Sequence, residues 1–107
     1  MIADPAAADA LVRALEDEEF DVRWGAADAL IALGRSGVIS ALRVLMHRSD
    51  SEWVREVVEH IVRQHHDTEY GRVLEPVLES LRSLGAEQIA PVAAHKALLQ
   101  LEQMYGR

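Results

Sequence analysis

The sequence contains no cysteine, so disulfide bonds and thiolate chemistry are excluded. Aromatic residues make up only 5% of the chain, and no apolar run is long enough to span a bilayer. The first five residues also lack the basic start and apolar block of a secretory signal peptide. We therefore expect a cytoplasmic protein that does not enter a membrane.

Positive charge is scarce. Ten arginines and one lysine face 18 acidic residues, which leaves a net charge of −7. A local basic patch is still compatible with this charge, but the arginines are interleaved with acids along the chain, which disfavours one. A negative protein of this kind is repelled by a polyanion. We therefore expect no nucleic-acid partner.

Half of the residues are hydrophobic, mostly alanine, leucine and valine, and 107 residues suffice for one domain with one core. Helical periodicity is clearest in residues 21–34. Their apolar positions lie on one helix face, at i, i+4, i+7, i+8 and i+11: Val22, Ala26, Ala29, Leu30 and Leu33. Asp21 offers an N-cap oxygen, and Gly34 can end the helix in a left-handed conformation.

The same reasoning predicts six helices, at about residues 5–17, 21–34, 38–48, 52–65, 69–84 and 91–104. The start signals are, in chain order, Asp4-Pro5, Asp21, Ser49 or Ser51, Asp67 or Thr68, and Pro91. We expect Phe20 to be tucked under the turn before the second helix. The inward rows of the fourth and fifth helices are Val54, Val57, Val58, Ile61 and Val62, and Leu74, Val77, Leu78, Leu81 and Leu84.

The chain repeats itself. Leu11 recurs as Leu42 at an offset of 31 positions, and the pair Val22-Arg23 recurs as Val54-Arg55 at an offset of 32. A weaker third copy follows if Leu30 is matched to Leu98, at an offset of 68. We therefore predict a single domain, residues 1–107, with repeat units at about 5–34, 36–65 and 69–104.

Residues 21–34, with Asp-Val-Arg followed by Ala-x-x-Ala-Leu-x-x-Leu, resemble the second helix of a HEAT-like repeat, as in phycobilisome-lyase-type proteins. The resemblance implies an all-α fold, a short right-handed α-α superhelix (solenoid) of about three antiparallel helix pairs. It also implies a non-catalytic scaffold that binds another protein or peptide. Arg23 and Arg55 would form a structural ladder, each bonding an acid or a carbonyl of the neighbouring unit, with Asp21, Asp28 or Glu59 as acceptors.

In HEAT-like arrays the second helix of each pair lines the concave side, so the resemblance also locates a binding surface. The same offsets of 32 and 68 positions carry the stripe beside Trp24 onto the fourth and sixth helices. The predicted concave-face residues are Trp24, Asp28, Ile31, Glu56, Glu59, His60, Arg63, His95, Lys96 and Leu99. Trp24 has two interpretations: an exposed contact residue, or a residue that lies on Arg55 or Glu56 and seals the repeat junction.

No nucleophile motif or phosphate loop is visible, so we predict neither an enzyme nor a bound cofactor. Glu56 and His60 share a helix face, but a zinc site needs at least three protein ligands, and we predict no metal. We expect His65 and His66 to interact with a helix C-terminus. The alternative is a lyase-like chaperone or metal-dependent HEAT-repeat enzyme that handles a cofactor such as a bilin. We expect a monomer, or a weak homodimer through Val92 and Leu99 of the last helix.

Overall fold

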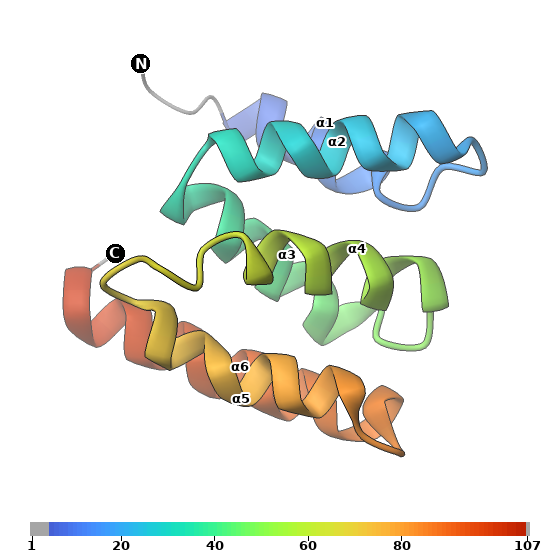
Figure 1. Cartoon of the computed structure of the whole chain (residues 1–107). Helices are drawn as coiled ribbons and strands as arrows, with labels where there is room; N and C mark the ends of the chain where they lie inside the picture. The colour runs from blue at the N-terminus through green and yellow to red at the C-terminus, as the bar shows by residue number, and fades with distance from the viewer. Residues whose placement is uncertain (1–4, 107) are drawn as a thin grey trace.

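The computed structural model describes residues 5–106, and Figure 1 shows that this part of the chain is all-α. The prediction of an all-α fold is confirmed. The six helices are α1 (Pro5–Ala14), α2 (Phe20–Ala32), α3 (Arg35–His47), α4 (Glu52–Arg63), α5 (Gly71–Arg82) and α6 (Ala86–Tyr105). Asp4, a predicted start signal, lies outside the described residues. None of the described helices combines the length and the apolar character needed to cross a membrane.

Several helix ends differ from the prediction. Ser51 does cap α4, because its Oγ accepts the backbone N–H of Val54 at 3.2 Å. However, α2 begins at Phe20, one residue before Asp21, and has no side-chain cap. Helix α6 begins at Ala86, so Pro91 lies inside it rather than opening it. The alanine-rich sequence around Pro91 sustains the helix despite the one hydrogen bond that proline removes.

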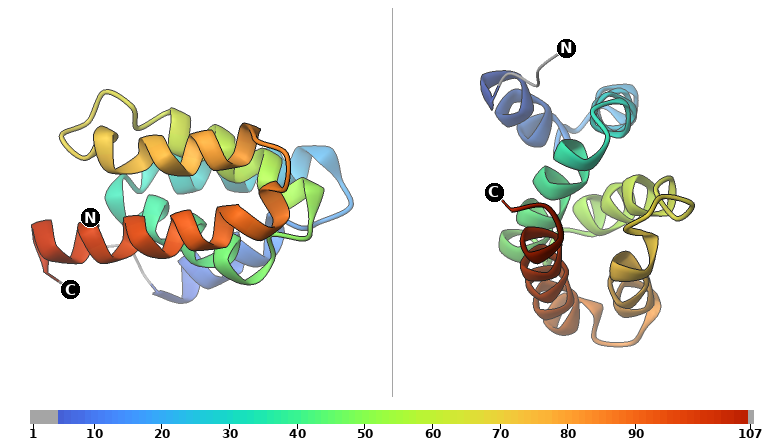
Figure 2. Two further views of the ribbon diagram at one scale, coloured as in Figure 1. Left: turned by 90° about the horizontal axis from the view of Figure 1, so that it is seen from below. Right: turned by 90° about the vertical axis from the view of Figure 1, so that its left-hand side faces the viewer.

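The helices form two layers, and the third pair enters them in reversed order. Helix α3 packs on α1 and α4 packs on α2, as in a repeat array. In the third pair, however, α5 packs on α4 and α6 packs on α3. The end-on view in Figure 2 shows one layer made of α1, α3 and α6, beside a second made of α2, α4 and α5. Within residues 5–106, α5 does not pack on α3, and α6 does not pack on α4.

Two side-chain contacts show that α6 runs antiparallel to α3. Just beyond the end of α3, Ser49 Oγ donates to the backbone oxygen of Glu87 near the start of α6, at 2.7 Å. At the opposite end, the Arg35 guanidinium lies 3.7 Å from the ring centroid of Tyr105. Helix α6 is therefore held along the whole length of α3.

The connections account for this reversal. Helices α2 and α3 are joined by only Leu33 and Gly34, with Gly34 at a φ of 68°. A Cβ on Gly37 would lie 1.8 Å from the Leu30 backbone oxygen, so only glycine permits this close crossing. Residues 64–70, which join α4 to α5, form a longer connection anchored by buried His65, stacked on Tyr70. The longer connection lets α5 return along α4.

One continuous core lies between the layers. The predicted row of α4 is confirmed, since all five residues are buried. The predicted row of α2 is partly wrong: Val22 is 42% exposed, whereas Arg23 and Ala27 are buried beside Ala26 and Leu30. Helix α2 packs on α1, α3 and α4, so its buried surface differs from the single predicted row. Phe20 and Leu84, both expected inside, are 61% and 100% exposed because they lie at turns that no helix covers.

We predict that Leu30→Ala lowers the free energy of unfolding by about 2–5 kcal/mol, because it leaves a cavity in a close-packed core. Leu30 is completely buried, whereas Leu84, which is fully exposed, provides the matched control. Chemical denaturation of both variants measures the difference. Equal midpoints for Leu30→Ala and Leu84→Ala would show that the core is assigned wrongly.

Candidate partner-binding surface

Part of the predicted concave face is assembled at the junction of α2 and α4. The Trp24 ring lies edge-on to the His60 ring, with 5.0 Å between centroids. Asp28 Oδ1 lies 3.8 Å from His60 Nε2, and Ile31 packs against the core. Trp24 is partly buried, and its indole N–H has no acceptor among residues 5–106. The structure therefore places Trp24 at the junction of α2 and α4, where His60 is its aromatic neighbour.

Two charged residues of α4, Glu59 and Arg63, form ion pairs within the protein. Glu59 pairs with Arg63 at 3.0 Å and with Arg82 of α5 at 3.1 Å. Glu56 is exposed and has no ion pair within residues 5–106. Helix α5, and not α6, thus continues the layer that α2 and α4 begin.

His95, Lys96 and Leu99 are not brought to this face, and their placement there was wrong. The 68-residue offset assumed that α6 stacks on α4, whereas α6 lies against α3 in the other layer. His95 and Leu99 line a groove between α3 and α6. Lys96 lines a smaller hollow of about 410 Å³ between α5 and α6.

The two matching arginines have equivalent partners, but not the predicted ones. Arg23 Nη1 donates to the backbone oxygens of Asp17 and Glu18, at 2.9 and 3.1 Å. Arg55 Nη1 donates to the backbone oxygen of Ser49 at 2.6 Å. Each arginine therefore closes the turn of its own unit, six residues upstream, instead of bonding the next unit.

A stacking contact, rather than a hydrogen bond, links the first arginine to the second unit. The Arg23 guanidinium lies 4.2 Å from the centroid of the Trp53 ring. Asp21, the nearest predicted acceptor in sequence, is exposed and forms no ion pair within the described part of the chain. The ladder is therefore built from carbonyl contacts within units and one cation–π contact between them.

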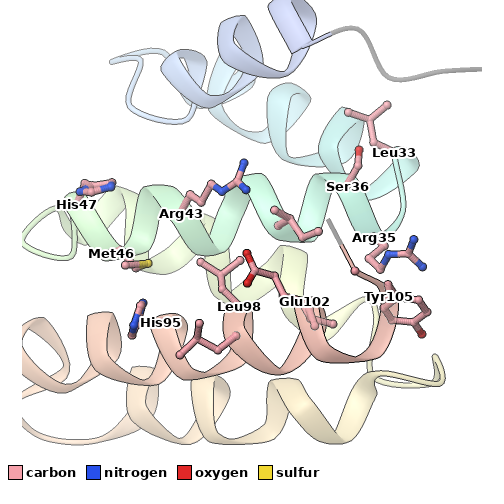
Figure 3. A pocket seen from close by; sticks show the side chains of 14 residues that line it. Leu33, Arg35, Ser36, Arg43, Met46, His47, His95, Leu98, Glu102 and Tyr105 are labelled. Atoms are coloured by element: carbon pink, nitrogen blue, oxygen red, sulfur yellow. The ribbon is translucent and has the colours of Figure 1, made fainter.

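The largest depression that we describe is the groove between α3 and α6, with a volume of about 920 Å³ (Figure 3). The sequence pattern does not reveal this groove, because the reversed pair brings together two helices that are far apart in the sequence. Its apolar lining consists of Leu33, Ile39, Met46, Leu98, Leu99 and Leu101. Figure 3 shows Met46 and Leu98 facing each other across the groove from α3 and α6.

The ionisable lining of the groove is mainly basic, in a protein of net charge −7. Arg35, Arg43 and His47 come from α3, and His95 comes from α6. Glu102 is the one acid in the lining. Arg43 is exposed and forms no ion pair with any residue from 5 to 106. The sequence signal was weak: Arg43 and His47 are four residues apart, on the side of α3 away from its buried row.

Tyr105 closes one end of the groove and joins three elements. Its hydroxyl donates to Glu69 Oε2, its ring lies under Arg35, and its edge meets Tyr70. The hydrogen bond to Glu69 raises the pKa of Tyr105 above its usual value of 10.0, and burial raises the pKa of Tyr70. In both cases the folded state favours the protonated phenol.

We therefore predict that stability falls as the pH rises above about 10. Both pKa values are higher in the folded than in the unfolded chain, so their contribution is complete below pH 10 and is lost as the phenols ionise. Denaturation midpoints at pH 8 and pH 11 measure this loss. The double variant Tyr70→Phe, Tyr105→Phe should lose less over this interval, and an unchanged loss would contradict the assignment.

Residues 5–106 contain no group of three or more histidine, aspartate or glutamate side chains placed to hold a metal ion. His65 is buried just beyond the end of α4, with Nδ1 3.0 Å from the backbone oxygen of Ile61. This contact agrees with the expected interaction at a helix C-terminus. His66 is exposed and lies 3.3 Å from Asp67.

Comparison with known proteins gives one family. A family model described as HEAT repeats matches residues 1–63, which include α1 to α4. The match ends before the pair that packs in reversed order. No curated protein and no solved structure matches the chain.

We predict that Trp24→Ala lowers the free energy of unfolding by about 3 kcal/mol, the low end of the range for large aromatic deletions, because Trp24 is only partly buried. The melting temperature should fall by several degrees. Trp53→Ala, at a site 40% exposed, should cost less. If Trp24→Ala kept the wild-type melting temperature, Trp24 would not stabilise the fold, and it would again be a candidate for contact with a partner.

Proposed function

The chain belongs to the HEAT repeat family, and on that premise we propose that it is a non-catalytic scaffold that binds another protein or peptide. We further propose the groove between α3 and α6 as its binding surface. Repeat scaffolds hold a fixed surface on stacked helices and bind partners there. Because the family match covers the fold and names no activity, the proposal depends on the surface itself.

The observation that supports the proposal is the apolar lining of this groove. Leu99 is 47% exposed there, and Ile39, Met46 and Leu98 are partly buried beside it. Exposed apolar groups gathered in a depression and rimmed by charge are typical of sites that receive a partner's side chains. The volume of the groove lies near the upper end of the range for small-ligand pockets. The groove is bounded by the two helices α3 and α6, and an elongated site of this kind suits a peptide segment.

The predicted face on α2 and α4 is a weaker candidate. Trp24 packs on His60, and the charges of Glu59, Arg63 and Arg82 neutralise one another. A partner would have to break these contacts to use the side chains. The groove, by contrast, combines an exposed apolar side chain, Leu99, with an arginine that forms no ion pair within the described residues.

The alternative of a cofactor-handling protein, which the likeness to phycobilisome-lyase-type repeats raises, makes a separate prediction. Such a protein would carry visible colour or bound metal after expression. We expect a colourless, metal-free protein in absorption spectroscopy and elemental analysis. Bound pigment or stoichiometric metal would favour the alternative.

We predict that wild-type protein captures a specific partner from extracts of its source cells, and that Leu99→Glu abolishes the capture. The substitution places a charge in the apolar lining, which opposes burial against a partner. Leu84→Glu is the matched control, because Leu84 is fully exposed and lies outside the groove. Mass spectrometry of the captured proteins gives the result.

Sedimentation equilibrium on the same variants tests self-association. We propose a monomer or weak homodimer, since Val92 and Leu99 are 55% and 47% exposed on α6. A tight wild-type dimer that Leu99→Glu dissociates would mean that the groove is occupied by a second copy. Equal capture by Leu99→Glu and Leu84→Glu would contradict the groove as the binding surface.

A further inference from the structure

We infer that the occupant of the groove between α3 and α6 is an acidic amphipathic helix similar in length to α3. This inference rests on the proposed function and adds the chemistry of the partner. It combines three observations: the length of the groove, its apolar lining, and two arginines that have no carboxylate partner within residues 5–106.

The length of the groove fits a short helix. Its lining runs along α3 from Arg35 to His47, the first and last residues of that helix. Helix α3 has 13 residues. At a rise of 1.5 Å per residue, this is about 20 Å, so a bound helix of similar length would span the groove. A helix lying beside α3 and α6 would bury its own apolar stripe on Met46, Leu98 and Leu99, the common mode of helix-in-groove binding.

The charge of the groove selects an acidic occupant. Arg43 is exposed and forms no ion pair with the described residues. The Arg35 guanidinium stacks on the Tyr105 ring at 3.7 Å, which fixes its position without engaging a carboxylate. A guanidinium held in this way binds a carboxylate through two parallel hydrogen bonds. Glu102 alone opposes this charge within the lining.

The negative net charge of the protein does not prevent an acidic helix from binding in the groove. Most of the acids lie outside the groove, in the α1–α2 turn and on α4 for example. At physiological ionic strength, charges more than about 8 Å apart in solvent are largely screened. The acidic helix therefore interacts mainly with the arginines that it touches. The same screening makes the binding sensitive to added salt.

The spacing of the arginines specifies the partner more closely. Arg35 and Arg43 are eight residues apart on α3, which corresponds to about 12 Å along the helix axis. A bound helix has the same rise, so its two carboxylates should lie seven or eight residues apart, on the same side and next to an apolar stripe. A helix with its acids elsewhere would satisfy one arginine at a time.

Three synthetic peptides test the inference. Each is as long as α3 and carries a fluorescent label, and each is built on an amphipathic helix with leucines on one face. The acidic peptide has glutamates seven residues apart beside the leucines. The basic peptide has lysines in place of these glutamates, and the scrambled peptide has the acidic composition without the spacing. Fluorescence anisotropy measures binding to the whole protein at low and physiological salt.

We expect the acidic peptide to bind at least about tenfold more tightly than the other two, and to weaken as salt is added. Arg43→Glu should reduce its affinity by about tenfold or more, because it removes one charge-assisted contact and adds a repulsion. Arg72→Glu is the matched control, since Arg72 is exposed on α5 and does not line the groove. Arg72→Glu should change the affinity less than about twofold. Melting curves check that both variants fold.

The outcomes separate the two proposals. Equal binding of the acidic and basic peptides, with both lost in Leu99→Ser, would overturn the acidic partner and leave the groove as a binding surface. Equal effects of Arg43→Glu and Arg72→Glu, with binding still weakened by Leu99→Ser, would lead to the same conclusion: the partner is not acidic, but it binds in the groove. Binding of no peptide, or binding that Leu99→Ser leaves unchanged, would contradict both the acidic helix and the groove.

Discussion

The packing of α6 against α3 is the constraint on which the rest of the structure depends. It is anchored at both ends of α3, by the Ser49–Glu87 hydrogen bond and by Arg35 over Tyr105. Between these ends the buried residues of α6 are mostly alanines, Ala90, Ala94 and Ala97. This packing reverses the third pair, places α5 beside α4, and creates the groove.

The reversed third pair departs from the stacking of a regular repeat array. In such an array each unit exposes an apolar face that the neighbouring unit covers in the same order. Here α5 and α6 exchange layers, and the chain folds back on α3 and α4. The family match ends at residue 63, where the regular stacking ends. The third pair thus departs from the packing pattern of the first two pairs.

The sequence specified local structure well where one periodic signal dominates. The row from Val54 to Val62 was predicted correctly because the apolar residues of α4 are concentrated on one face of the helix. The prediction failed for Val22 because the apolar residues of α2 are spread around the helix, which packs on α1, α3 and α4. In addition, Arg23 turns inward and donates to the backbone oxygens of Asp17 and Glu18. The prediction that Pro91 opens the last helix failed because the surrounding residues favour a helix more strongly than proline favours a helix start.

The candidate site shows a different limit. Seven of the ten predicted surface residues lie on the packed helices α2 and α4, because the 32-residue offset between these helices matches real stacking. The residues on α6 were misplaced, because periodicity identifies the inward face of a helix but not the layer it joins. The layer that a helix joins depends on the length of the connection before it. The seven residues 64–70 between α4 and α5 permit the reversal, whereas the two residues between α2 and α3, Leu33 and Gly34, do not. The groove depends on the reversal and was therefore invisible in the sequence.

The exchange of α5 and α6 can be measured directly by pulsed electron paramagnetic resonance. The chain has no native cysteine, so spin labels can be placed at single introduced ones. Ser36 on α3, Arg63 on α4 and Glu102 on α6 are exposed. Reversed packing predicts a shorter distance between labels at 36 and 102 than between labels at 63 and 102. The opposite order, with position 102 nearer to 63, would mean that α6 stacks on α4 and would contradict the account.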